Sequence, residues 1–456
     1  MNIIIAGMGK VGSSLAEVLS SEDHDITVID SDKSVVKTAS EKYDVMTVSG
    51  NSATLEVLKN AGVKNADLLI TSTGSDEINM ISCITAKKLN ERIQTISRIR
   101  NPEYYDQIYS MKDRYGITMI VNPELDASDE IEKLIRGPGF LKRDSFAKGK
   151  VQLAELKIES NSKLAGVTLN KLSSVTKANI LICLVKRKDQ VFVPDGGFTL
   201  MAGDRIYIAG SVKDLENLLR DLNIIPKKAR KVIICGGGKI SYYLAYKLSS
   251  DSSINVKIIE KDEDRCVSLA SSLPNVNIVC GDASNISFLE SEWVSDADAL
   301  VNLTGLDELN IILSIYGQSV GVPNVITKLG RGTANMKFIS DTANIGSVIS
   351  PKELCCDRIV SRVTAMKNQT GAANAIHFIA DGKAQAMEFD VNLNFKHLSK
   401  PLKDVKLKKG ILLGCIMRKD HTIIPNGDTT VEYKDTLVVV SSSDRIIEDL
   451  NDIFED

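Results

Sequence analysis

Short apolar runs alternate with helix-like stretches along residues 1–122, which is the pattern of a parallel sheet with helices on both faces. The opening apolar run at residues 3–6 predicts a buried strand, residues 13–20 predict a helix, and residues 26–29 predict a second strand. Further strands are predicted at residues 45–50, 66–74, 94–100 and 117–123, with helices at 54–62 and 79–89. The acidic and apolar stretch at 126–136 then predicts a helix that leaves the sheet.

Three glycines follow the first strand in the spacing G-x-G-x-x-G, at Gly7, Gly9 and Gly12. Gly7 permits the tight turn off the strand, Gly9 has no Cβ to hold a phosphate away from the backbone, and Gly12 allows the helix to pack closely on the sheet. The helix start offers free N–H groups and the positive end of its dipole to a phosphate. Asp30 ends the second strand, where its carboxylate can accept both ribose hydroxyls of an adenosine. Together these features predict a nucleotide-binding βαβ unit.

The same arrangement occurs a second time, beginning near residue 231. Gly236 and Gly238 stand 229 residues beyond the first two glycines of the opening loop, and Glu260 stands 230 beyond its aspartate. A steady offset over so long a span predicts a tandem duplication. Ser241 occupies the position of the third glycine. We expect Ser241 to cap its helix, and its side chain to push the helix and the strand apart.

Each copy continues into a smaller segment of different character. Residues 151–210 contain several strand-like runs and residues 215–222 a helix, and the second copy has similar runs from residue 384 onward. The predicted fold class is therefore α/β, with two tandem Rossmann-like doubly wound parallel sheets, each followed by a small α+β subdomain. The basic stretch at 226–231 is the expected linker between the halves. The expected boundaries are 1–122 (first nucleotide-binding subdomain), 123–150 (crossover helix and linker), 151–225 (first small subdomain), 226–350 (second nucleotide-binding subdomain), 351–383 (crossover helix and linker) and 384–456 (second small subdomain).

The helix after each fourth strand begins with polar residues in both copies. Asp76 and Asn79 stand at this point in the first copy, and Asp307 and Asn310 in the second. We expect them to cap the helices and complement the helix dipole, or to contact a ligand or a subunit.

Composition narrows the class of protein. Hydrophobic residues make up 43% and charged residues 25%, as in an ordinary globular protein, and no apolar run reaches the roughly 18 residues that span a bilayer. A net charge of −3, without interleaved aromatic and basic residues, argues against nucleic acid as a partner. The eight cysteines show no C-x-x-C pair and the four histidines no metal-ligand spacing. We therefore expect reduced core thiols, no metal and a cytoplasmic location.

Two tandem nucleotide-type folds, without a catalytic or membrane domain, resemble the TrkA family of peripheral subunits in bacterial and archaeal Trk potassium-uptake systems. Chains of that family carry tandem RCK domains, which are also called KTN domains. The resemblance covers essentially the whole chain. It rests on GMGKVG with Asp30, GGGKIS with Glu260, the paired segments SGNSATLEVLKNAGVKNADLLI and CGDASNISFLESEWVSDADALV, and a P-x-G followed by a strand beginning GDRI or KDTL.

The resemblance implies a regulatory role and no enzymatic one. Proteins of this family bind NAD(H) or adenine nucleotides, and their RCK units form a ring whose shape alters the ion permeability of a membrane subunit. For this chain it implies a place on the inner face of the cell membrane, a potassium-translocating partner of the TrkH type, and a homotetramer with a ring of eight RCK units. Arg98 and Lys328, which end the fifth strands, would reach a phosphate. The implied nucleotide-contacting residues are Gly7, Met8, Gly9, Lys10, Val11, Gly12, Asp30, Thr73, Gly74, Arg98, Gly236, Gly237, Gly238, Lys239, Ile240, Glu260, Thr304, Gly305 and Lys328.

The residues leave several alternatives open. The acidic residue after the second strand argues against NADP, whose 2′-phosphate it would repel, but it does not separate NAD from ATP, ADP or AMP. Lys10 and Lys239 either meet a terminal phosphate or point to water. Two other functions are an NAD-dependent oxidoreductase with an unrecognised active site and a nucleotide-binding assembly protein without a transport partner. Tyr243 and Lys247 have the Y-x-x-x-K spacing of short-chain dehydrogenases, but they lie on the helix directly after the glycine loop, where they would not face a nicotinamide.

Overall fold

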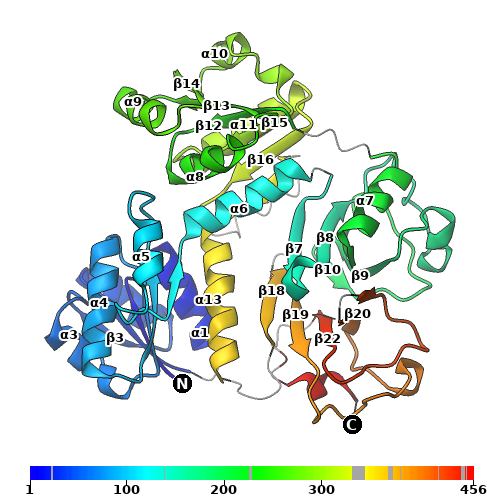
Figure 1. The fold of residues 1–456 in the computed structure, drawn as a ribbon, viewed down its shortest axis with the longest axis horizontal. Coiled ribbons are helices and arrows are strands. Elements are labelled where there is room, and N and C mark those ends of the chain that lie inside the picture. Colours follow the sequence, from blue (N-terminus) through cyan, green and yellow to red (C-terminus); the bar gives the residue numbers. More distant parts are fainter. Residues whose placement is uncertain are drawn as a thin grey trace.

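The structure, a computed structural model, describes residues 1–21, 24–137, 139–224, 229–330, 345–367, 373–380, 382–419, 421–442, 447 and 449–455. Within these residues the chain forms four sheets, which belong to two larger N units and two smaller C units (Figure 1). Residues 226–228 of the expected linker lie outside the described part of the chain.

The first N unit is a six-stranded parallel sheet with strand order β3-β2-β1-β4-β5-β6. Ile5 of the central strand lies opposite Val28 on one side and Ile70 on the other, and all three side chains are buried. Strand order reverses between β1 and β4, and open α/β sheets bind ligands at such a point. The elements are β1 (Asn2–Ala6), α1 (Lys10–Ser20), β2 (Asp25–Asp30), α2 (Lys33–Lys42), β3 (Met46–Ser49), α3 (Leu55–Asn60), β4 (Leu68–Thr71), α4 (Asp76–Leu89), β5 (Gln94–Arg98), α5 (Tyr105–Met111) and β6 (Met119–Val121).

The second N unit repeats this topology, with strand order β14-β13-β12-β15-β16-β17 and parallel pairs throughout. The predicted fold class of two tandem doubly wound parallel sheets is thereby confirmed. The elements are β12 (Lys231–Cys235), α8 (Lys239–Leu248), β13 (Asn255–Glu260), α9 (Glu263–Ser272), β14 (Asn277–Cys280), α10 (Ile286–Ser291), β15 (Ala299–Asn302), α11 (Asp307–Ser319), β16 (Asn324–Lys328) and β17 (Ser347–Ile349).

The C units are antiparallel five-stranded sheets, with strand orders β10-β9-β11-β8-β7 and β18-β19-β22-β20-β21. Strands β7 and β18 lie within the segments 123–150 and 351–383, where we expected only a helix and a linker. Each forms the edge strand of a C sheet, where β7 pairs with β8 and β18 pairs with β19. Phe146 and Ile379, at the ends of these two strands, are buried between the two C units, and this burial stabilises the edge pairing. The elements are β7 (Lys142–Phe146), β8 (Val151–Lys157), β9 (Ile180–Arg187), β10 (Gln190–Phe192), β11 (Arg205–Ser211), α7 (Val212–Asp221), β18 (Ala375–Ile379), β19 (Ala384–Asp390), β20 (Ile411–Arg418), β21 (His421–Ile423) and β22 (Thr436–Ser441).

The two crossover helices are exchanged between the N units. Helix α6 (Pro123–Arg136) leaves the first N unit and packs on α8 of the second, where Ile131 and Leu134 join its core. Helix α13 (Pro351–Lys367) leaves the second N unit and packs on α1 of the first, where Ile359 and Val360 join the core. Figure 1 shows α6 and α13 in the middle of the molecule, between the N units and the C units. The helix predicted to leave the sheet therefore completes the other copy.

The sheets of the two C units pack against each other. Their shared core includes Phe146, Cys183 and Tyr207 from the first C unit with Ala386 and Val438 from the second. Hydrophobic burial of this kind is the dominant stabilising contribution in a folded chain. The C units therefore hold the two halves together at a second place, away from the exchanged helices.

The cysteines are mostly buried, as expected for core thiols. Cys355 and Cys356 lie in the core of the first N unit, whereas Cys280 is exposed. Among the described residues, no helix is long and apolar enough to cross a membrane.

Candidate nucleotide sites

In the first glycine loop, close backbone packing leaves no room for a side chain at two of the three glycines, whereas the remaining one faces open space. Gly7 has a φ of +93°, and a Cβ there would lie 2.7 Å from the backbone nitrogen of Thr73. A Cβ on Gly12 would lie 1.9 Å from the carbonyl oxygen of Gly7, so the helix could not approach the loop as it does. A Cβ on Gly9 would meet nothing within 4 Å. The space beside Gly9, at the start of α1, is therefore where a phosphate could approach the backbone.

Asp30 closes this loop from the tip of β2. Its Oδ2 accepts a hydrogen bond from the backbone N–H of Met8 at 2.7 Å, and its Oδ1 accepts one from Asp32 at 3.0 Å. An ionised carboxylate has about four acceptor positions, so each oxygen can accept a further hydrogen bond from a ribose hydroxyl. Asp30 therefore joins the glycine loop to the second strand and keeps capacity for a ligand.

The second loop is built in the same way around Gly236, which has a φ of +99°. Glu260 accepts hydrogen bonds from the backbone of Gly237 at 2.5 Å and from Lys261 at 2.8 Å. Ser241 is fully buried, and its hydroxyl donates to the carbonyl oxygen of Gly236 at 2.5 Å. The expectation that Ser241 caps the helix was wrong, because Gly238 is the N-cap residue of α8 and no side chain accepts a hydrogen bond from the backbone there. Its hydroxyl instead joins the start of α8 to the preceding strand.

Arg265 also contacts the second glycine loop, although the sequence did not predict it as a site residue. Its Nε donates to the carbonyl oxygen of Gly237 at 2.7 Å. An open hollow of about 550 Å³ lies here. Arg265 lies on α9, away from every motif, so spacing alone offered no signal for it. The residues that line the hollow are Gly237, Gly238, Glu260, Asp262, Asp264, Arg265 and Ser268.

The turn after the fourth strand is held by a buried asparagine in each copy. In the first, Asn79 accepts hydrogen bonds from the backbone and hydroxyl of Thr73 at 2.9 and 2.7 Å and donates to the carbonyl of Arg98 at 2.9 Å. In the second, Asn310 makes the same bonds with Thr304 and Lys328. These asparagines are therefore not helix caps. Their signal in the sequence was the constant offset between the copies.

Asp76 and Asp307 also depart from the capping expectation. Ser75 caps α4, whereas Asp76 accepts hydrogen bonds from the backbone N–H groups of Arg100 and Asn101 at 2.7 and 2.9 Å. Asp307 accepts one from the backbone of Gly330 at 2.9 Å. Both aspartates therefore hold the segment that follows the fifth strand, while they still lie in the first turn of a helix, where negative charge is favourable.

Arg98 and Lys328 lie inward at the ends of the fifth strands. The Arg98 guanidinium donates to the carbonyl of Thr73, and its Nε, which is buried, has no hydrogen-bond partner within the described part of the chain. Burial lowers the pKa of Arg98, and the neighbouring Arg100 lowers it further. Burial likewise lowers the pKa of Lys328, partly offset by Asp307. A buried cation with a free donor fits an anionic group such as phosphate.

Lys10 and Lys239 extend from each glycine loop toward the other copy. A Cβ on Gly330 would lie 3.4 Å from the Lys10 ammonium and 3.5 Å from Asp307, which places Lys10 beside the start of α11 in the second N unit. Hydrogen bonds from Ser75 and Tyr104 lower the pKa of Glu77 to about 2, with a smaller contribution from Lys239. The lysines therefore lie between the two candidate sites.

The remaining expected residues offer backbone rather than side chains. Met8, Val11 and Ile240 are buried in the cores of their N units, so their side chains would not contact a ligand. The N–H of Met8 is already donated to Asp30, which leaves the N–H groups of Val11 and Ile240 for a ligand. A Cβ on Gly74 or Gly305 would meet nothing within 4 Å. These positions line open space at the carboxyl ends of β4 and β15.

The chain matches family models over most of its length. The TrkA-N domain matches residues 3–123 and 232–365, and the TrkA-C domain matches residues 153–223 and 387–454. A Trk system potassium uptake protein TrkA homolog from Archaeoglobus fulgidus is 33% identical over 454 residues, which is 100% of both chains.

Solved structures show the same fold. The crystal structure of the GsuK RCK domain matches with a TM-score of 0.63 and 17% identity, over 97% of this chain and 92% of that one. The GsuK channel bound to NAD matches with a TM-score of 0.61 and 18% identity, over 97% of this chain and 77% of that one. With two TrkA-N and two TrkA-C domains and a full-length relative of this kind, the chain belongs to the TrkA family of Trk potassium-uptake proteins.

Proposed function

We propose that the chain is a nucleotide-sensing regulatory subunit that binds NAD(H), ATP or ADP and gates a potassium-translocating membrane subunit of the TrkH type. The observation that carries this proposal is the pair of glycine loops, each at a reversal of strand order and each closed by an acidic residue. Membership of a potassium-uptake family supports the transport role. The NAD-bound GsuK channel supports NAD as a ligand of this fold.

The loop residues divide the ligand between them. The backbone of residues 7–11 and 236–240 would hold phosphates at the starts of α1 and α8. The N–H groups of Met8 and Gly237 already bond Asp30 and Glu260, so the phosphates would meet the N–H groups that begin the two helices. Asp30 and Glu260 would accept ribose hydroxyls. The unpartnered Nε of Arg98 would gain an anionic partner. The nucleotide supplies charge and adenosine contacts to the N units, and no reaction on it is required.

The exchanged helices would carry the signal. Because α6 and α13 each join one N unit to the core of the other, a ligand that changes the angle between the N units also moves both helices. Arg358 of α13 bonds Asp126 of α6 at 2.6 Å, so the helices move together. Gating is then a population shift, which requires different nucleotide affinities for the two shapes. The chain would act from the cytoplasmic face of the membrane.

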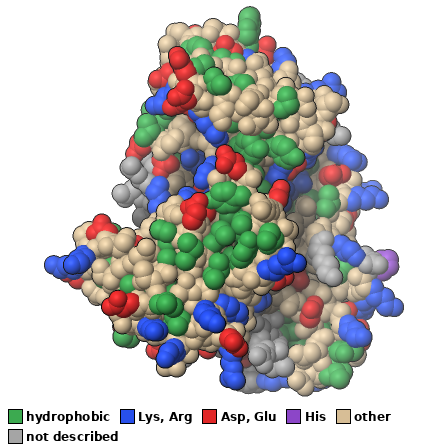
Figure 2. All heavy atoms as spheres, turned by 60° about the vertical axis from the view of Figure 1, so that its left-hand side comes forward, with side chains coloured by type: hydrophobic (Ala, Val, Ile, Leu, Met, Phe, Trp, Pro, Cys, Tyr) green, Lys and Arg blue, Asp and Glu red, His purple; other side chains and the backbone are tan. Residues whose placement is uncertain are grey.

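Self-assembly would use matching faces on the N units. Ile81 and Ile84 on α4 are 48% and 40% exposed, and Ile312 and Ile315, at the equivalent positions of α11, are 56% and 46% exposed. Figure 2, with the first N unit forward, shows a hydrophobic patch surrounded by charged side chains. Contiguous exposed apolar surface marks interaction sites. Four chains joined through such faces would give the ring of eight RCK units.

The Y-x-x-x-K spacing of Tyr243 and Lys247, which would favour an oxidoreductase, has a structural role here. The Tyr243 hydroxyl donates to the carbonyl of Arg100 at 3.0 Å and accepts from Asn122 at 3.1 Å. Lys247 donates to Ser128 and Asp129 of α6. Tyr243 therefore joins α8 to the first N unit and to the N-cap residue of α6, and Lys247 joins α8 to α6 itself, so both residues are engaged in holding the two copies together.

The test combines binding with transport. The tagged chain would be retrieved from detergent-solubilised native membranes and washed with and without ATP, ADP and NADH, and rubidium uptake would be measured with the recovered complex in proteoliposomes. We expect a TrkH-type subunit whose retention and flux change with nucleotide. The Asp30→Asn, Glu260→Gln double variant should retain the partner but need about tenfold more nucleotide for the same response. Recovery of no potassium-transport subunit under any condition would refute the gating role.

A further inference from the structure

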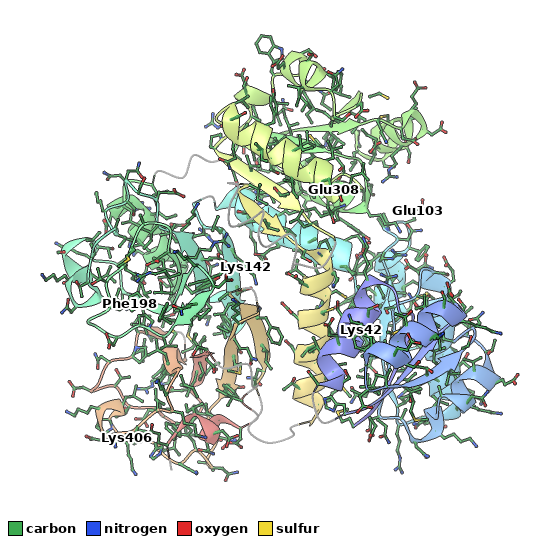
Figure 3. All side chains as sticks on the ribbon, turned by 180° about the vertical axis from the view of Figure 1, so that it is seen from behind. Lys42, Glu103, Lys142, Phe198, Glu308 and Lys406 are labelled. Carbon is green, nitrogen blue, oxygen red and sulfur yellow. The ribbon has the colours of Figure 1, made fainter. Side chains whose placement is uncertain are left out.

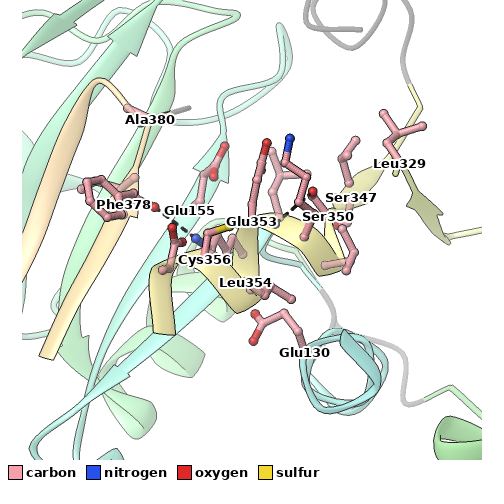
Figure 4. Close-up of a pocket in the computed structure, with 18 of the residues that line it drawn as sticks. Glu130, Glu155, Leu329, Ser347, Ser350, Glu353, Leu354, Cys356, Phe378 and Ala380 are labelled. Atoms are coloured by element: carbon pink, nitrogen blue, oxygen red, sulfur yellow. Dashed lines mark hydrogen bonds between the residues drawn. The ribbon is translucent and has the colours of Figure 1, made fainter. Parts of the chain in front are cut away.

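A second cavity lies between the N units and the C units, away from both glycine loops (Figure 4). Its volume of about 490 Å³ is within the range of about 300–1,000 Å³ found for small-molecule pockets. Helices α1, α6 and α13 and strands β7, β8 and β18 contribute to its wall, so it touches both crossover helices and both C units. Its charged lining residues are Glu17, Glu130, Lys142, Glu155, Arg205, Lys352, Glu353 and Asp357.

The inner basic groups of this cavity already have acidic partners. The Lys142 ammonium lies 3.4 Å from Asp144 and donates to the carbonyl of Phe378 at 3.3 Å, and Arg205 lies 3.3 Å from Glu155. Figure 3 shows Lys142 between the C units and α13. An anionic ligand would therefore have to displace one of these ion pairs or bind through Lys352, at the start of α13, alone.

The unsatisfied groups are acidic. Glu130 on α6 is only 6% exposed, and its Oε2 accepts from Lys133 at 3.1 Å, while its Oε1 has no partner among the described residues. Figure 4 shows Glu130 extending from α6 beside Leu354 of α13. No described residue donates a hydrogen bond to Asp357, and burial raises the pKa of that carboxyl to about 7 although Lys142 opposes the shift. A buried acceptor without a donor is costly, so the cavity favours a ligand that donates.

The duplication identifies the missing donor. Asp129 and Asp357 occupy equivalent positions, each six residues after the proline that begins its crossover helix. Asp129 receives a hydrogen bond from Lys247 on α8. The residue of α1 equivalent to Lys247, at the offset of 229 found in the glycine loops, is Val18, which lines the cavity. Val18 therefore offers Asp357 no hydrogen-bond donor of the kind that Lys247 offers Asp129. The cation that acts on Asp357 is Lys142, whose ammonium is already engaged with Asp144 and with the carbonyl of Phe378.

We propose that this cavity is an effector site for a small organic amine, whose ammonium group takes beside Asp357 and Glu130 the place that Lys247 takes beside Asp129. Apolar residues such as Leu354 and Val360 would cover its aliphatic part. A metal ion is a poorer candidate, because the described residues contain no group of three or more His, Cys, Asp or Glu that could hold one. An amine held here would bridge α6, α13 and the C units, and so would act on the same helices as the nucleotide.

The test is calorimetric titration of the full-length protein with putrescine at pH 7, in two buffers of different ionisation enthalpy. We expect saturable binding with release of about half a proton per site, because Asp357 is about half protonated at pH 7. Affinity should be at least about tenfold weaker in both Asp357→Asn and Glu130→Gln, as for lost hydrogen bonds to a charged group. Val18→Lys should abolish binding, since its own ammonium fills the site. Val212→Lys adds the same charge at an exposed position of α7 and should bind normally, as should Asp129→Asn.

Absence of saturable heat at about 10 mM putrescine would overturn the proposal. Equal affinities in the Val18→Lys and Val212→Lys proteins would also overturn it, because binding would then follow net charge. If Val18→Lys does not fold, unchanged affinity in Asp357→Asn overturns the proposal, and weakened affinity supports it.

Discussion

The two N units share one strand order, but their helices meet the glycine loops differently. In the first unit a Cβ on Gly12 would collide with the carbonyl of Gly7 at 1.9 Å. In the second unit Ser241 fills the equivalent position and donates a hydrogen bond to the carbonyl of Gly236. The third glycine of the motif is therefore a packing requirement in one copy and replaceable in the other. The same fingerprint can bring a helix close to its glycine loop through two local solutions.

The largest difference in stability between the two copies should appear when each receives the other's residue at the third glycine position of the loop. Gly12→Ser places a side chain against backbone that cannot move aside, and we expect it to lower the free energy of unfolding by about 3 kcal/mol. Ser241→Gly removes one buried hydrogen bond and should cost only about 1 kcal/mol. Chemical denaturation of the two full-length variants measures both values. Equal losses would mean that the two loops pack alike.

The next largest difference concerns the equivalent aspartates of the crossover helices. Folded Asp357 keeps its proton to a pH of about 7, whereas an unfolded aspartate ionises near 3.8. The native state thus binds more protons between these pH values, so stability contributed by protonated Asp357 is present at low pH and is lost as pH rises toward 7.

Replacement by asparagine removes this dependence. Asp357→Asn should stabilise the protein at pH 8, by about 2 kcal/mol, and have little effect at pH 4. Asp129→Asn, which removes a carboxylate bonded to Lys247, should not stabilise at pH 8. Thermal unfolding at the two pH values checks both. A pH-independent effect of Asp357→Asn would contradict the assigned protonation.

A smaller effect is expected at the strand tips. Asp30→Asn and Glu260→Gln each weaken acceptance from ribose hydroxyls, and each should lower NAD affinity at its own loop by about tenfold, or roughly 1.4 kcal/mol. Titration of each single variant with NAD would show one weakened class of site and one unchanged. Loss of both classes in a single variant would show that the loops bind as a unit.

The smallest effect should come from the ion pair between α8 and α6. Lys247 and Asp129 are partly exposed, at 23% and 49% of their side chains, so Lys247→Met should cost only about 0.5 kcal/mol. Val18→Met, the matching change on α1, should leave stability unchanged because it breaks no ion pair. Urea denaturation distinguishes these outcomes, and a loss above about 2 kcal/mol would mean that Lys247 has a larger structural role.

Much of the fold and part of each candidate site could be predicted from the sequence. The glycine spacing, the acidic residue after each second strand and the constant offset all depend on local chain geometry, so they were readable directly. Arg265 was missed because its contact with Gly237 joins a helix to a loop of another βα connection. The strands β7 and β18 were missed because each is an edge strand of five residues.

The sequence by itself determined the alternation of strands and helices, the duplication and the ends of the strands where a nucleotide would bind, because these follow from periodicity and turn chemistry. Only the tertiary structure decided which copy each crossover helix completes. The apolar face of α6, with Ile131 and Leu134, could cover either N unit, and the packed structure places it on the second. It also decided that Asp129 has a lysine beside it and Asp357 a cavity, since that depends on side chains from helices far apart in the chain.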